Sequence, residues 1–159
     1  MKIEKRLEEI GLELPRPMIL PTGVTLPFPW VRIHGNRAFV SGHGPLLRDG
    51  SLPPLLGKVG AEVSQSEAYE AARSTALAVL ASLRAALGDL DRVTAWLRVF
   101  GMVNAAPGFT SAPAVINGFS DLILELWGHE AGSHARSAVG LAELPFRIPV
   151  EIEAEVAIH

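Results

Sequence analysis

The chain has 159 residues, of which 48% are hydrophobic, and its formal net charge is −3. This length and apolar content predict one domain with a sizeable core. The absence of cysteine excludes a disulfide framework and a thiolate metal site, and the acidic balance argues against nucleic acid as the main partner.

The beginning of the chain is charged and amphipathic rather than like a signal peptide. No apolar run approaches the ~20 residues of a membrane span. We therefore expect a cytoplasmic protein that does not bind membranes.

The first third of the chain predicts one short helix followed by a hairpin. Residues 2–10 carry an apolar stripe that stops at Gly11, and a proline-rich connector covers residues 14–29. Two strand-like runs at 30–34 and 37–42 then flank Gly35-Asn36, a two-residue hairpin signal. Residues 57–61 are expected to add a short strand.

Two long helices alternate with strands in the rest of the chain. A capping box at Ser64–Glu67 opens a helix over 65–87, and a second helix covers 113–127, with a loop from 129 to 133. The strands expected around these helices are 93–103, the run that begins near Arg136, and 150–158. This order predicts an α+β sandwich in which two main helices pack on one face of a mixed sheet.

The opposite face of this sheet is also predicted to be partly apolar. In residues 150–158 the apolar positions point one way and Glu151, Glu153 and Glu155 the other. In residues 93–103 the alternation places Trp96, Arg98, Phe100 and Met102 on one face, opposed by Ala95, Leu97 and Val99. One helix layer cannot bury both faces, so we expect self-association.

The most informative candidate residues lie in the C-terminal segment, where Arg136 and Glu151 occupy two successive strands. A guanidinium offers a two-donor fork that matches a carboxylate, and a buried carboxylate with a raised pKa can take a proton from water. The alternative is that the two residues form a structural ion pair. Glu153 and Glu155 are interpreted as structural or interface charges.

Other polar residues carry weaker signals. His43 follows Ser41-Gly42 at a strand end, where it can contact a ligand or lie in the core. Asn117 precedes a glycine inside a helix, an unfavourable pair that indicates a packing or ligand role. Ser41 lies in no G-x-S-x-G elbow, which argues against a serine hydrolase. His129, Glu130 and His134 match no standard metal-ligand spacing, so no metal is predicted.

The chain resembles the Rid family of reactive intermediate deaminases, also known as L-PSP endoribonuclease-like or translation-inhibitor-like proteins. The resemblance covers about residues 28–159. It rests on these motifs: Ser41-Gly42 before Pro45, Asn117, Ala135-Arg136-Ser137, Leu144-Pro145 and Val150–Ala154. It implies a chorismate-mutase-like fold and a homotrimer with sites between subunits, with residues 1–27 as an N-terminal extension that packs on a single domain.

The resemblance also implies an activity. Arg136 would hold the carboxylate of a 2-imino or enamine acid, and Glu151 would activate water that hydrolyses the C=N bond to a 2-keto acid and ammonia, without any cofactor. The implied substrate-binding residues are Phe28, Ser41, Gly42, His43, Asn117 and Ala138. Phe28 and His43 depart from the family pattern, in which a tyrosine and a glutamine-like residue are common. The alternatives are a non-catalytic trimer that binds a carboxylate metabolite, and an endoribonuclease.

Overall fold

The computed structural model describes residues 2–159, which contain one five-stranded sheet. The strands are β1 (Val31–His34), β2 (Arg37–His43), β3 (Val93–Asn104), β4 (Ala135–Leu141) and β5 (Val150–Ile158). They lie in the order β1-β2-β5-β3-β4, and β3 and β4 are parallel while the other neighbours are antiparallel. The predicted mixed sheet is confirmed.

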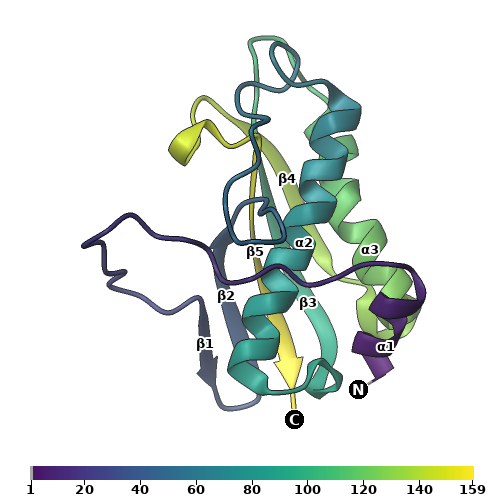
Figure 1. Cartoon of the computed structure of the whole chain (residues 1–159). Helices are drawn as coiled ribbons and strands as arrows, with labels where there is room; N and C mark the ends of the chain where they lie inside the picture. Colours follow the sequence, from purple (N-terminus) through teal and green to yellow (C-terminus); the bar gives the residue numbers. More distant parts are fainter. Residues whose placement is uncertain (1) are drawn as a thin grey trace.

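Two long helices, α2 (Gln65–Leu87) and α3 (Ala112–Gly132), cover one face of the sheet (Figure 1). The Ser64 capping box that opens α2 is formed as predicted, and Gly88 ends the helix in a left-handed conformation. The two helices pack closely at Gly118, where an added Cβ would lie 2.0 Å from the carbonyl oxygen of Tyr69. This close packing explains the glycine after Asn117, and the predicted α+β fold class is confirmed.

Helix α1 (Lys2–Glu9) lies beside α3, and its Ile3 and Leu7 are buried in the common core. The connector after α1 then crosses the outer side of α2 before it reaches β1 (Figure 1). Backbone hydrogen bonds from Arg16 to Arg48 and from Ile19 to Gly50 attach the connector to a turn. None of the helices within residues 2–159 is long and apolar enough to cross a membrane.

Two sequence predictions about secondary structure are wrong. Residues 57–61 form no strand, because Val59 makes only isolated bridges to Val63 and Ala105. The loop expected at 129–133 is mostly a last helical turn of α3, which extends to Gly132. Gly128, with φ 75°, interrupts the helix where the prediction ended it, but the chain resumes helical geometry.

The predicted face of Trp96 is also wrong. The β3–β5 register shifts between Trp96 and Arg98, so an irregularity breaks the alternation. Trp96 is therefore buried against the helices together with Val99 and Val103, whereas Arg98 is exposed. A strict period of two cannot predict a bulge that is set by pairing with a distant strand.

The sheet face away from the helices remains partly apolar. Phe100 and Met102 of β3 are half-buried there, and Phe39 and Val139 are 41% and 39% exposed. Charged groups accompany them, including an Arg37–Glu155 ion pair with an N–O distance of 2.7 Å. This uncovered surface is consistent with the predicted homotrimer, which stays a prediction.

Candidate functional site

Arg136 lies on β4 with its guanidinium against helix α3. Its Nη1 donates to Oδ1 of Asn117 at 2.8 Å and to Oγ of Ser120 at 3.2 Å, and Nη2 donates to the carbonyl oxygen of Pro113 at 3.4 Å. All three acceptors are neutral, and Arg136 forms no salt bridge within residues 2–159. Its positive charge is therefore positioned but not neutralised.

The surroundings of Arg136 also hold a histidine. His134 donates from Nδ1 to the carbonyl oxygen of Gly132 at 2.7 Å, so its Nε2 accepts from Oγ of Ser120 at 2.9 Å. Burial lowers the pKa of His134, and the nearby Arg136 lowers it further. Ala138, two residues after Arg136 on the same face of β4, is half-buried against the core. We call Arg136, Asn117, Ser120 and His134 the arginine cluster.

Glu151 lies elsewhere, on β5 next to the end of β2. A Cβ added to Gly42 would lie 2.5 Å from Oε2 of Glu151, so the absence of a side chain at residue 42 makes room for this carboxyl group. Burial raises the pKa of Glu151, and the neighbouring Glu153 raises it further. A carboxyl group of this kind has the properties of a general base that works closer to neutral pH.

His43 is buried beside Glu151's strand, with only 6% of its surface exposed. Its Nδ1 donates to the carbonyl oxygen of Ser41 at 2.5 Å, so its Nε2 accepts from Oγ of Ser82 at 2.8 Å. The ring of Trp30 packs on the imidazole with a centroid distance of 4.9 Å. Burial lowers the pKa of His43, which favours the neutral ring, in which Nε2 is the acceptor.

Glu151, Gly42 and His43 share a cavity of about 1130 Å³. Its other walls come from the connector (residues 14–29), the start of β1, the segment 44–52, the second half of α2 and the turn at 145–148. Phe28 lines this cavity and is 46% exposed, whereas Ser41 does not line it and donates its hydroxyl to the carbonyl oxygen of Pro29 at 2.8 Å. We call this cavity the connector chamber.

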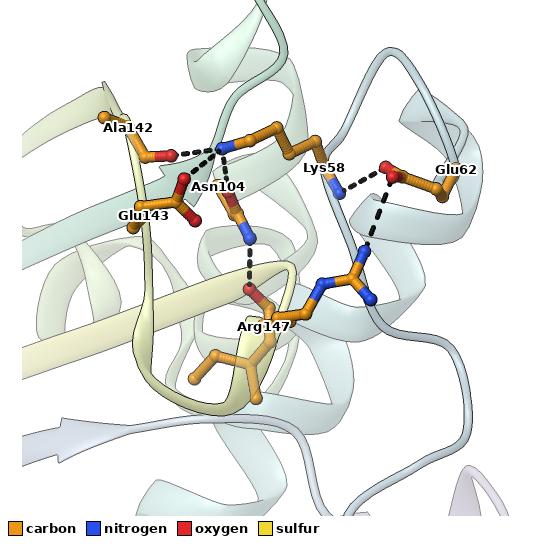
Figure 2. Close-up of polar contacts among 7 residues, drawn as sticks. Lys58, Glu62, Asn104, Ala142, Glu143 and Arg147 are labelled. Atoms are coloured by element: carbon orange, nitrogen blue, oxygen red, sulfur yellow. Dashed lines mark hydrogen bonds and ion pairs between the residues drawn. The ribbon is translucent and has the colours of Figure 1, made fainter.

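The turn at 145–148, which closes one side of the connector chamber, is anchored by a network of polar contacts (Figure 2). Buried Asn104 accepts from Nζ of Lys58 at 3.0 Å and donates to the carbonyl oxygen of Ile148 at 3.3 Å. Lys58 also contacts the Ala142 carbonyl oxygen and lies 3.6 Å from a carboxylate oxygen of Glu143. Together these contacts fix both ends of the segment 142–148.

The turn itself has an unusual backbone. Phe146 and Arg147 have φ values of 57° and 58°, a left-handed conformation that side chains other than glycine adopt rarely. Arg147 is tied to Glu62 by a contact of 3.4 Å, and its carbonyl oxygen accepts from the backbone of Gly57. The ring of Phe146 is 63% exposed and lines the connector chamber.

Six of the eight predicted site residues divide into two groups within one chain, and Ser41 and Ala138 line neither cavity. The structure brings Arg136 together with Asn117, and Glu151 together with Gly42, His43 and Phe28. It does not bring Arg136 to Glu151: the two line different cavities, and the ion pair considered as an alternative is not formed. Sequence reasoning missed Ser120, Ser82 and Phe146, which show no motif and become neighbours only through the fold.

Within residues 2–159 the only group of carboxylates and histidines close enough to share a metal ion is Glu4, Asp89 and Asp91. These carboxylates cap backbone amides at the start of α1 and around Leu90. None of the predicted site residues belongs to this group.

Comparisons with known proteins agree on the family. Residues 4–148 match the family described as "YjgF/chorismate_mutase-like, putative endoribonuclease". Protein TCP17 from Trypanosoma cruzi is 38% identical over 158 residues, which is 99% of this chain and 95% of that protein. The crystal structure of Atu1372 from Agrobacterium tumefaciens is 39% identical with a TM-score of 0.86, over 99% of this chain and 92% of that one.

A crystal structure from Shewanella oneidensis, described as that of "a putative endoribonuclease", is 32% identical with a TM-score of 0.87, over 99% of this chain and 100% of that one. The fold alone is also shared with Escherichia coli TdcF, solved with bound serine, at 19% identity and a TM-score of 0.59, over 92% of this chain and 99% of that one. The chain thus belongs to the YjgF/chorismate-mutase-like family.

Proposed function

We propose that this protein is a hydrolytic deaminase of 2-imino and enamine acids, which it converts to 2-keto acids and ammonia. The observation that carries the proposal is the Glu151 carboxyl group, which lies against Gly42 in the connector chamber with a raised pKa. Ionised Glu151 takes a proton from water while the oxygen adds to the electrophilic C=N carbon. That proton then moves to the nitrogen, which gives a carbinolamine. Glu151 next takes the hydroxyl proton and passes it to the nitrogen, so that the C=O bond forms as the C–N bond breaks and ammonia leaves.

Arg136 is the residue suited to hold the substrate carboxylate. Its guanidinium is oriented by Asn117, Ser120 and the carbonyl oxygen of Pro113, and no acidic group within residues 2–159 neutralises it. A carboxylate that replaced these neutral acceptors would gain a charge-assisted, two-point contact. The TdcF structure contains serine, a ligand with a carboxylate, which supports a ligand of this kind here.

The two groups must come together for the reaction, and one chain does not bring them together. We propose that a homotrimer does so, with Arg136 of one subunit facing Glu151 of the next. The partly apolar face of the sheet, with Phe39, Phe100 and Val139, supports this assembly. Analytical ultracentrifugation at micromolar concentration is expected to give three times the mass of the 17.0 kDa chain; a stable monomer would exclude shared sites.

The test of function is a deaminase assay in which an amino acid oxidase generates imino acids in situ from a panel of amino acids. Decay of the imino acid, followed by semicarbazide trapping, is expected to be faster with the protein than with buffer or with Arg136→Ala. Equal decay rates in all three for every imino acid would refute the proposal.

A non-catalytic carboxylate-binding protein is the second candidate. Phe28 offers no hydroxyl to a ligand, and the Nε2 of His43 is already hydrogen-bonded to Ser82. This candidate predicts that keto acids bind beside Arg136 without any turnover. The ribonuclease activity named for the Shewanella relative is less well supported, because the connector chamber is mostly apolar and the chain is acidic. We propose no nucleic-acid partner.

A further inference from the structure

The connector chamber is larger and more apolar than a short imino acid requires. Its volume of about 1130 Å³ lies slightly above the ~300–1,000 Å³ typical of sites for drug-sized ligands. Most of its lining is apolar, including prolines 15, 17 and 21 and Leu20, Val24 and Leu26 of the connector. A ligand with one or two carbon atoms beyond the imino carbon would leave these walls in contact with water.

The polar groups of the chamber are few and have defined positions. His43 and Ser82 are hydrogen-bonded to each other, and Arg84 lies 3.9 Å from a carboxylate oxygen of Glu4. Arg16 is the remaining charged wall residue besides Glu151. The carboxyl group of Glu151, by contrast, forms no ion pair within the part of the chain that the structure describes. The chamber thus offers a reactive group next to a broad apolar surface.

The apolar wall is an ordered part of the fold. The connector is hydrogen-bonded to the turn around Gly50, where an added Cβ would lie 2.2 Å from the carbonyl oxygen of Pro17. On the opposite side, Ala78, Ala81 and Ala85 of α2 present small side chains toward the chamber. Because the side chains of α2 on this side are small, the space between the helix and the proline-rich connector stays unfilled.

From these features we infer that the substrate carries a long or bulky apolar side chain, which occupies the connector chamber while its imino carbon lies at Glu151. The inference rests on the proposed function and specifies its substrate class: 2-imino acids with at least four side-chain carbon atoms. The apolar surface of the chamber then stabilises the complex, because each buried methylene leaves water.

The test measures binding of straight-chain 2-oxo acids with 4, 6, 8 and 10 carbon atoms by isothermal titration calorimetry. Affinity is expected to rise about fourfold per methylene up to the 8-carbon acid, the fold-change that corresponds to ~0.8 kcal/mol, with an increasingly negative heat-capacity change. Affinity that stays within twofold across the series would overturn the inference.

Two variants identify the chamber as the place of binding. Ala85→Phe fills the chamber from an exposed position of α2, so the 8-carbon acid is expected to lose at least tenfold while the 4-carbon acid changes less than twofold. Ala81→Leu repeats the test from a half-buried position. Glu70→Phe, which adds the same ring on α2 outside the chamber, is the control. Equal losses in Ala85→Phe and Glu70→Phe would overturn the inference.

The deaminase assay separates this inference from the proposed function. Length-dependent binding without turnover of any imino acid would refute the deaminase and support the chamber as an apolar carboxylate-binding site. Turnover with no dependence on side-chain length would support the deaminase and overturn the substrate class proposed here.

Discussion

The arginine cluster and the connector chamber contain the same hydrogen-bonding arrangement of a histidine and a serine, in different surroundings. In each, a histidine donates from Nδ1 to the carbonyl oxygen two residues before it and accepts from a helix serine: His134 with Ser120, and His43 with Ser82. The arginine cluster adds a guanidinium in a cavity of about 230 Å³, whereas the chamber adds a carboxyl group in one of about 1130 Å³.

Under the proposed function, the difference indicates how recognition and reaction would be divided between the two regions. The arginine cluster is local, because all its members lie between Asn117 and Arg136, on α3, on β4 or in the short link that joins them. The chamber is assembled from the connector, α2, β2, β5 and the turn at 145–148. Changes in the two regions should therefore have different kinetic signatures.

The largest effect is expected for Glu151→Gln, which keeps the size of the side chain but removes the base. Turnover should fall by ~10²–10⁴-fold while 2-oxo acid affinity stays close to that of wild type. Because the pKa of Glu151 is raised, the acidic limb of the wild-type pH–rate profile should lie above pH 4.5, the ordinary value for Glu. Steady-state assays between pH 4 and 8 measure the turnover and the position of the acidic limb. Full activity in the Gln variant would identify another base, and His43 is then the next candidate.

Arg136→Lys should have the opposite effect: the affinity for keto acids should fall by a larger factor than the turnover rate. A lysine keeps the charge but cannot bridge a carboxylate with two parallel donors, and such a charged hydrogen bond contributes ~1.5–3 kcal/mol. Keto-acid affinity should fall about 10- to 150-fold by calorimetry, the equivalent of that range. If affinity is unchanged, Arg136 does not hold the carboxylate.

These two predictions depend on residues that the sequence alone identified, and the reason is local. The motifs around Arg136 and Glu151 lie on regular strands, and the capping box of α2 needs only four consecutive residues. The chamber could not be predicted, because its walls depend on where the connector crosses α2. The bulge at Trp96 depends likewise on pairing with β5. The boundary of the N-terminal extension at residue 27 stays a prediction.

A smaller effect is expected on stability from the network behind the chamber turn. Asn104→Ala removes a buried amide, leaving Lys58 and the carbonyl oxygen of Ile148 without this partner, so the free energy of unfolding should fall by ~1–3 kcal/mol. Urea denaturation measures the change. The control is Glu62→Gln, which weakens an exposed contact with Arg147 and should lower the free energy of unfolding less than Asn104→Ala does. Equal losses would show that the buried amide has no special role.

The smallest expected effect is on the pH dependence of stability, where His43 and His134 can be compared. Burial lowers the pKa of both His43 and His134 in the folded chain, so below pH 6.5 the unfolded chain binds protons that the folded chain does not. The free energy of unfolding should therefore decrease as the pH falls from 7 to 5.5, with His43 contributing at most ~1.4 kcal/mol per pH unit.

Urea denaturation across this range should show a shallower slope for His43→Gln than for wild type. His134→Gln should flatten the slope less, because His134 is only half-buried. An unchanged slope in both variants would mean that neither imidazole titrates on unfolding.

The left-handed backbone at Phe146 and Arg147 has a consequence for engineering. Each such residue costs roughly 1–2 kcal/mol relative to a right-handed conformation, and glycine would relieve part of that cost. A search for thermostable variants should therefore select glycine at residue 146 early. That substitution would also remove the aromatic ring beside the chamber, so the gain in heat resistance and the loss of substrate selectivity would arrive together.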